Sequence, residues 1–354
     1  MLQKARLAQS RCRKSQTSDD YQGQSHACQA FLRPLHMISA RFNRRQWLAM
    51  GLALAALSAP ALAEDGAFER RLGHLVVIGG AEDRLKDRLI LRRFVDLCGG
   101  PQARILVLTA ASADPTASWR GYEPVFRELG AERCEPLDVR STEQANDPAL
   151  VNRLLHADGI FMTGGDQRRL MGLLWETEAV RAMHLAFHLR GCCIGGTSAG
   201  AAALSRLMLA EGDTPRLPEK DAAVLDLGLG FVSRAIIDQH FSERRRLGRL
   251  LSVLAQRPDM LGVGIDEDTA LVIERGRGVE VIGQGAVTLI DGRRMRSNFE
   301  DVDSNERLEM LGVSLHVLPA GHRYSVQPER SARVLPNSLL DAIGTLVAPG
   351  PIGG

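Results

Sequence analysis

Residues 192–204 read CCIGGTSAGAAAL. An apolar run, Cys192–Ile194, leads into a G-x-S-x-G pentapeptide at 196–200, and a run of alanines follows it. A serine at the centre of such a pentapeptide sits on a tight, strained turn between a strand and a helix, and it needs small neighbours there. The stretch therefore predicts a strand, a sharp elbow and a helix, with Ser198 as a nucleophile. Close packing or phosphate binding is the alternative use of a glycine-rich turn of this kind.

The segments before this elbow have the same layout. Three further short apolar runs, residues 75–78, 104–109 and 159–163, end in small or glycine-rich loops. Helix-like stretches lie between the runs, at residues 87–98, 122–129, 148–156 and 168–190. Continuously apolar strands that alternate with helices predict an α/β domain with a parallel sheet flanked by helices. Active sites in such sheets lie at the carboxyl ends of the strands, where these loops fall.

The pattern changes after about residue 260. Short β-branched runs separated by turn residues follow one another, at 261–265, 270–273, 279–282 and 286–290. Strands joined by such short turns predict a C-terminal antiparallel extension of the same domain. We therefore expect a single catalytic α/β domain over residues 64–354, with a loosely packed tail from about Pro328.

Residues 1–63 have the layout of a leader. Arg44-Arg45 precedes an apolar run, Leu48–Ala59, which is followed by the small-residue signature Ala61-Leu62-Ala63. This order is typical of an export signal, and the arginine pair indicates the twin-arginine type. About a dozen apolar residues are too few to span a membrane, which takes about 20. We expect cleavage before Glu64 and a periplasmic or extracellular protein with no membrane attachment; residue 37 is a possible true start.

Charge and cysteine content exclude several classes of function. Nine of the 44 Lys and Arg residues but only two of the 42 Asp and Glu residues lie in 1–63, which leaves residues 64–354 with a net charge of −5. A chain of that sign gives no reason to expect nucleic-acid binding. The body has four cysteines, Cys98, Cys134, Cys192 and Cys193, without a CxxC or Cys/His spacing. We expect free thiols, no metal and no cofactor.

A nucleophilic serine needs a base and a group that orients the base. His240 follows the apolar run Ala235–Ile237, so it lies at the end of a predicted strand. A carboxylate then comes from Asp266, Glu267 or Asp268; alternation along a strand directs Glu267 away from the other two, and the residues alone do not separate the three.

Other histidines are weaker candidates for the base. His184 and His188 are spaced i,i+4 on an apolar helix, without a carboxylate partner. An α/β-hydrolase order, with the histidine last, would use His316 or His322, but neither follows a convincing strand.

Four ordered motifs together carry a family resemblance. They are Gly164-Gly165-Asp166-Gln167, Gly196-Thr197-Ser198-Ala199-Gly200-Ala201, Asp238-Gln239-His240-Phe241 with arginines after it, and Gly264-Ile265-Asp266-Glu267-Asp268-Thr269-Ala270. With them the chain resembles the cyanophycinase family over residues 72–325. These serine peptidases degrade the aspartate–arginine polymer cyanophycin and are related to aspartyl dipeptidases. The resemblance implies a flavodoxin-like fold akin to class I glutamine amidotransferases.

The resemblance also implies roles for particular residues. It makes Ser198 the nucleophile, His240 the general base and Glu267 the group that orients the base. It assigns the oxyanion N–H groups to Gly165 and Ala199. Residues of the substrate cleft would be Gln167, Asp238, Gln239, Arg244, Arg246 and Arg249. A solvated basic face is the alternative for the arginines, and we expect it for Arg245.

The predicted function is an exported peptidase that releases β-Asp-Arg dipeptides from cyanophycin through an acyl-enzyme. Besides this substrate, the partner we consider is a second copy of the chain in a homodimer. An aspartyl or isoaspartyl dipeptidase on the same fold is the nearest alternative. A non-catalytic periplasmic peptide-binding protein is a further one, although binding alone needs no nucleophile elbow.

Overall fold

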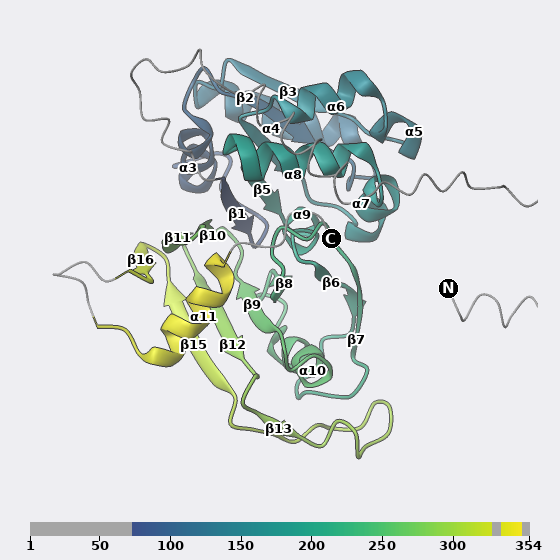
Figure 1. Ribbon diagram of the computed structural model, residues 1–354, viewed down its shortest axis with the longest axis vertical. Coiled ribbons are helices and arrows are strands. Elements are labelled where there is room, and N and C mark those ends of the chain that lie inside the picture. The colour runs from purple at the N-terminus through teal and green to yellow at the C-terminus, as the bar shows by residue number, and fades with distance from the viewer. Residues whose placement is uncertain (1–72, 328–333, 349–354) are drawn as a thin grey trace, which may run out of the picture. The chain divides into compact units, whose positions relative to one another are not determined.

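A computed structural model describes residues 73–327 and 334–348 (Figure 1). The export signal predicted in residues 1–63 lies outside this range, as does the domain boundary at residue 64, and both stay predictions. None of the helices in the described ranges is long and apolar enough to cross a membrane.

A large sheet carries five parallel strands. In spatial order they are β1 (His74–Ile78), β5 (Cys193–Thr197), β4 (Gly159–Met162), β2 (Arg104–Leu108) and β3 (Arg133–Leu137). Counted from β2 along the chain, the order β3-β2-β4-β5 is the 2-1-3-4 order of flavodoxin-like sheets. β1 occupies the next position, so the first strand of the described chain lies beside the strand that ends at Thr197, directly before Ser198.

Three antiparallel strands extend this sheet beyond β1. They are β10 (Thr269–Glu274), β11 (Gly278–Gly283) and β16 (His322–Ser325). A second sheet has the order β15 (Ser314–Pro319), β12 (Ala286–Asp291), β9 (Leu261–Ile265) and β8 (Ala235–Gln239). The predicted antiparallel extension is thereby confirmed, with one difference. β9 pairs parallel to β8, because helix α10 (Leu247–Gln256) forms the crossover between them.

Helices cover both faces of the large sheet (Figure 1). On one face, α3 (Leu89–Cys98) and α4 (Pro115–Glu128) contribute Phe94 and Phe126 to a cluster with Phe161 of β4. The other face is covered by α6 (Pro148–Leu155), α7 (Gln167–Leu174) and α8 (Glu178–Arg190). Shorter elements complete the described ranges: α5 (Thr142–Ala145), α9 (Ala199–Ala202) and the strand pairs β6 (Leu207–Gly212) with β7 (Ala223–Leu227) and β13 (Arg296–Ser297) with β14 (Met310–Leu311).

Two expectations about helices need correction. The stretch 168–190 is not one helix, because Glu176 adopts φ +57° and separates α7 from α8. The tail is not loosely packed over residues 334–348. It forms α11 (Asn337–Val347), whose apolar residues Leu339, Ala342, Ile343, Leu346 and Val347 recur at helical spacing and join the main core.

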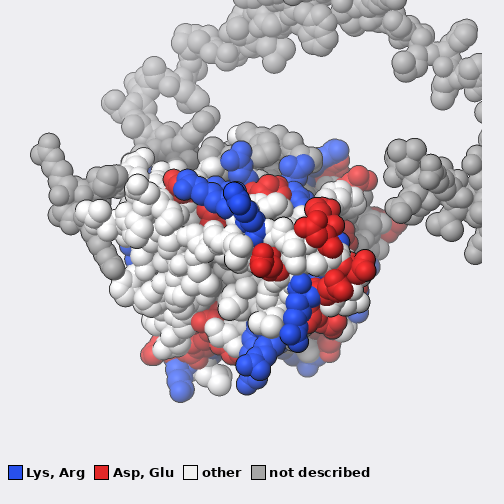
Figure 2. Space-filling view, turned by 90° about the horizontal axis from the view of Figure 1, so that it is seen from below, with Lys and Arg blue, Asp and Glu red and all other residues white. Residues whose placement is uncertain are grey.

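Figure 2 shows the molecule from below. On this face Lys and Arg side chains alternate with Asp and Glu side chains, and a broad area has neither. On the coloured part of this face, charges of both signs are therefore mixed.

Candidate active site

Ser198 lies on an elbow at the carboxyl end of β5. Its backbone has φ 52° and ψ −112°, and α9 begins directly after it. The flanking glycines are needed for space, because a Cβ at Gly196 would lie 2.4 Å from the Gly200 carbonyl oxygen. The strand, elbow and helix predicted from residues 192–204 are all present.

A chain of two hydrogen bonds links Ser198, His240 and Glu267. Ser198 Oγ lies 2.9 Å from His240 Nε2, and His240 Nδ1 lies 2.5 Å from Glu267 Oε1. The His240 residue is only 8% exposed, which holds its ring in place, and it follows β8 directly. A serine, a histidine and a carboxylate in this sequence of contacts are the parts of a nucleophilic triad.

The three consecutive carboxylates after β9 each contact a different partner. Asp266 Oδ1 accepts from the N–H and hydroxyl of Ser242, and Asp268 Oδ1 accepts from the Asp83 N–H. Of the three carboxylates that sequence left open, Glu267 is the one that contacts the imidazole.

The end of β1 and the turn after it contact Ser198, His240 and the neighbour of Glu267 through their backbone. Consecutive carbonyl oxygens of Ile78, Gly79 and Gly80 accept from the N–H groups of Ser198, His240 and Asp268, at 3.1, 2.8 and 2.9 Å. Sequence reasoning missed this role and treated Gly79-Gly80 only as the end of a strand. The glycine pair itself was the available signal, because a Cβ at Gly80 would lie 2.4 Å from Cε1 and Nε2 of His240.

Backbone strain is concentrated here. Positive φ is adopted by Ala81, Ser198, His240 and Asp268, at 50°, 52°, 47° and 44°. Each such residue costs on the order of 1–3 kcal/mol and persists where surrounding contacts hold it. Strain of this kind gathers at functional sites.

The two residues predicted to supply oxyanion N–H groups both lie near Ser198. Ala199 follows Ser198 in the chain, and a Cβ built on Gly164, the neighbour of Gly165, would lie 3.4 Å from Ser198 Cβ. Gly165 has φ +146°, and a Cβ there would lie 2.1 Å from the Ala111 carbonyl oxygen. Within the described ranges neither the Gly165 nor the Ala199 N–H has a backbone acceptor.

Residues 75–281, more than half of the chain, match Peptidase family S51. The chain belongs to peptidase family S51. It is accordingly a serine-type peptidase.

Curated relatives cover most of the chain. A cyanophycinase of Geminocystis herdmanii is 40% identical over 252 residues, which is 71% of this chain and 93% of the relative. A cyanophycinase of a Nostoc species is 39% identical over 251 residues, which is 71% of this chain and 84% of the relative. A solved peptidase from an acI-B1 actinobacterium has a TM-score of 0.52 at 22% identity, over 72% of this chain and 98% of the other, and it shows a shared fold.

The S51 chain buries Asp238 between two arginines. Its carboxylate accepts from Arg249 Nε at 3.0 Å, from Arg249 Nη2 and from Arg246 Nη1 at 3.2 Å. Arg246 also donates to the carbonyl and side-chain oxygens of Gln239. Burial raises the pKa of Asp238, against the lowering by the two guanidinium groups, and burial lowers the pKa of Arg246 to about 10.

Four of the six predicted cleft residues contact one another in the interior of the protein. Asp238, Gln239, Arg246 and Arg249 form one buried network, and the Arg246 Nε is a buried atom without a partner within the described ranges. Arg244 and Arg245 are exposed. The Gln167 amide nitrogen donates to the Leu209 and Ala210 carbonyls. Contact of these residues with substrate stays a prediction.

The histidines His184 and His188 lie away from this site, on α8. Their rings stack on each other at 5.6 Å between centroids, and His184 also stacks on Phe231 at 4.2 Å. Arg275 Nη1 lies 2.8 Å from His188 Nδ1. Groups of three metal-ligating side chains are absent from the described ranges.

His188 is expected to make the fold sensitive to acid. Burial, and then Arg275, lower its pKa from 6.5 to about 4. The folded state therefore binds fewer protons than the unfolded state between these values, so stability is full above about pH 6.5 and falls as pH drops toward 4. His188→Gln should lose less stability than the parent between pH 7.5 and 5, measured as Tm. Equal losses in both proteins would contradict this.

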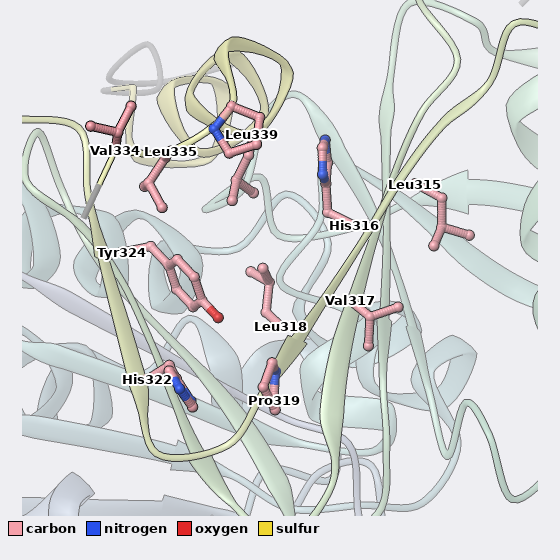
Figure 3. A pocket seen from close by; sticks show the side chains of 11 residues that line it. Leu315, His316, Val317, Leu318, Pro319, His322, Tyr324, Val334, Leu335 and Leu339 are labelled. Atoms are coloured by element: carbon pink, nitrogen blue, oxygen red, sulfur yellow. The ribbon is translucent and has the colours of Figure 1, made fainter.

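The histidines near the C-terminus do not reach the nucleophile. His316 and His322 line a cavity of about 560 Å³ that lies between β15, β16 and the start of α11 (Figure 3). Its lining contains none of Ser198, His240 and Glu267; it comprises residues 315–319, His322, Tyr324, 334–336 and Leu339. The three residues that contact one another therefore follow the order Ser198, His240, Glu267 along the chain.

Proposed function

We propose that this S51 peptidase is an exported enzyme that hydrolyses cyanophycin to β-Asp-Arg dipeptides through an acyl-enzyme. The observation that carries the proposal is the hydrogen-bonded Ser198–His240–Glu267 chain. Its occurrence in a protein about 40% identical to cyanophycinases over most of their length supports the substrate.

The chemistry follows from the contacts of the three residues. Ser198 Oγ attacks the carbonyl carbon of the scissile amide while His240 Nε2 takes its proton, and Glu267 holds the ring and stabilises the imidazolium. The N–H groups of Gly165 and Ala199 stabilise the oxyanion. His240 then returns the proton to the leaving nitrogen as the C–N bond breaks. A water molecule, deprotonated by His240, hydrolyses the ester and frees Ser198.

The substrate has both charges in every repeat, a carboxylate and a guanidinium. Arginine binds carboxylates in a bidentate manner, and a buried aspartate suits a guanidinium. The buried network of Asp238, Gln239, Arg246 and Arg249 begins two residues before His240 and so brings both kinds of charge beside the base. Exposed Arg244 lies on the turn that follows His240.

Digestion of insoluble cyanophycin tests the substrate. The purified protein should release soluble β-Asp-Arg, identified by mass. Cleavage of isoaspartyl dipeptides with the polymer left intact would favour a dipeptidase instead. Failure of a serine-directed phosphonate to label the protein would favour a non-catalytic binding protein.

Arg244 and Arg245 form a matched pair of exposed cations. If Arg244 binds a substrate carboxylate, Arg244→Ala loses a charge-assisted contact worth about 1.5–3 kcal/mol, or about ten- to hundredfold in kcat/KM. Arg244→Lys should give an intermediate defect, since it keeps the charge but not the bidentate geometry. Arg245→Ala should change little. Parental kcat/KM in both alanine variants would assign Arg244 to a solvated face.

Export is expected to remove residues 1–63. Arg44-Arg45, the apolar run and Ala61-Leu62-Ala63 occur in the order of a cleavable signal. N-terminal sequencing of the exported protein should start at Glu64, and replacing both arginines by Lys should block export by the twin-arginine route. An intact leader on the exported protein would contradict cleavage.

A further inference from the structure

Glu82 is a buried carboxylate that lies outside the triad. It is 5% exposed, and each of its oxygens accepts a hydrogen bond from a hydroxyl group. Tyr122 donates to Oε1 at 2.5 Å, and Thr197 Oγ1 donates to Oε2 at 2.6 Å. Burial, and then the charge of Glu82, raise the pKa of Tyr122 well above its ordinary value, so the phenol stays a donor. Within the described ranges no Lys or Arg forms an ion pair with Glu82.

Burial of a carboxylate without a cation beside it lowers the stability of the fold. Removal of a carboxylate from water is unfavourable, and hydroxyl donors offset only part of that cost. A neutral side chain of similar size would fill the same space. Packing alone therefore does not explain why a carboxylate occupies this position.

The contact with Thr197 supplies that reason. Thr197 is the last residue of β5 and the direct neighbour of Ser198, whose backbone is strained. Glu82 belongs to the Gly79–Asp83 turn, in which the carbonyls of Gly79 and Gly80 bind the backbones of His240 and Asp268. The bond from Thr197 to Glu82 thus joins the nucleophile's strand to the turn that holds the base.

We propose that Glu82 is a positioning residue for the nucleophile: through Thr197 it holds the strained elbow so that Ser198 Oγ stays in reach of His240 Nε2. The proposal rests on the proposed role of Ser198. It assigns the effect to the hydrogen bond with Thr197 and not to the charge of Glu82 acting on His240 at a distance.

Thr197→Val tests this, because it keeps the shape of the side chain and the charge of Glu82 but removes the hydroxyl. We expect kcat to fall about ten- to hundredfold, in line with the cost of small misplacements in an active site. KM should change less than about twofold, since substrate contacts are untouched. The rate at which a small phosphonyl fluoride labels Ser198 should fall in parallel, and the acid limb of the pH–rate profile should not move.

Thr197→Ser is the matched control, because it keeps the hydroxyl and should retain most of the labelling rate. Glu82→Gln keeps a hydrogen-bonding group of the same size, so its kcat and labelling rate should fall less than those of Thr197→Val. If Thr197→Val does not fold, Glu82→Gln is measured in its place. Parental kcat and labelling in a folded Thr197→Val, with only a lower Tm, would reduce the bond to a structural contact. A displaced acid limb in Glu82→Gln, with Thr197→Val at the parental rate, would assign the effect to charge and overturn the proposal.

The labelling assay separates this inference from the substrate assignment. A parent that is labelled but does not digest cyanophycin loses its proposed substrate, while the labelling rates of the variants still decide the role of Glu82. A parent that is not labelled at all loses both the nucleophile and its positioning residue.

Discussion

Replacing Ser198 by alanine is expected to lower kcat by about 10⁴–10⁶-fold, the loss usual for a member of a triad. The change removes the one oxygen that lies 2.9 Å from His240 Nε2 and leaves the elbow backbone in place. Alanine adopts the positive φ of this position no less easily than serine, so Tm should stay close to the parental value. Initial rates on cyanophycin and a thermal melt measure the two quantities.

Ser304→Ala is the control for this variant, since Ser304 is exposed and lies in the segment between β13 and β14. It should keep the parental rate. A well-folded Ser198→Ala protein with substantial activity would be incompatible with an acyl-enzyme at this residue.

Replacing Gly80 by alanine is expected to lower kcat at least about a hundredfold. A Cβ at Gly80 would lie 2.4 Å from Cε1 and Nε2 of His240, well inside contact distance. The ring must then leave its place between Ser198 and Glu267, and displacements of about 1 Å cost on the order of 10²-fold in rate. Initial rates with near-saturating substrate measure the loss.

Gly100→Ala is the matched control for backbone strain. Gly100 has φ +85°, close to the +101° of Gly80, but a Cβ there meets nothing within 4 Å. Both variants should lose stability to strain, while only Gly80→Ala should lose activity. Similar rates in the two variants would mean that the imidazole adapts without cost.

The parallel part of the fold was predictable because its strands are buried on both faces. β1, β2, β4 and β5 appear in the sequence as uninterrupted apolar runs that end in small residues. β3 was not predicted because it has no such apolar run. It is the edge strand of the sheet, four of its five residues are not buried, and Pro136 interrupts its sequence. The tail was expected to be loosely packed because the residues just before α11 have no apolar side chains at helical spacing, and the apolar residues of α11 were overlooked for that reason.

The triad candidates were predictable because each follows an apolar strand in a motif of its own. The supporting contacts were not. Ile78, Gly79 and Gly80 act through their backbone carbonyls. Every residue has such a carbonyl, so the sequence does not show which ones accept a hydrogen bond. The partners of Glu82 lie 40 and 115 residues away, so only the folded chain brings them together. The arginines after His240 gave no sign of which would be buried, because Arg246 and Arg249 become so by pairing with Asp238.

The position of β1 makes the site depend on segments that are far apart in the sequence. β1 lies between β5 on one side and β10 on the other, and its last residue and the turn after it contact segments from residues 198, 240 and 268. A chain cut before Thr269 would still contain Ser198, His240 and Glu267, but it would lack β10, the strand that pairs with β1 on the side away from β5. The site therefore forms only when the two ends of this stretch fold together, since the turn after β1 supplies the backbone acceptors and residues 198–268 supply the side chains.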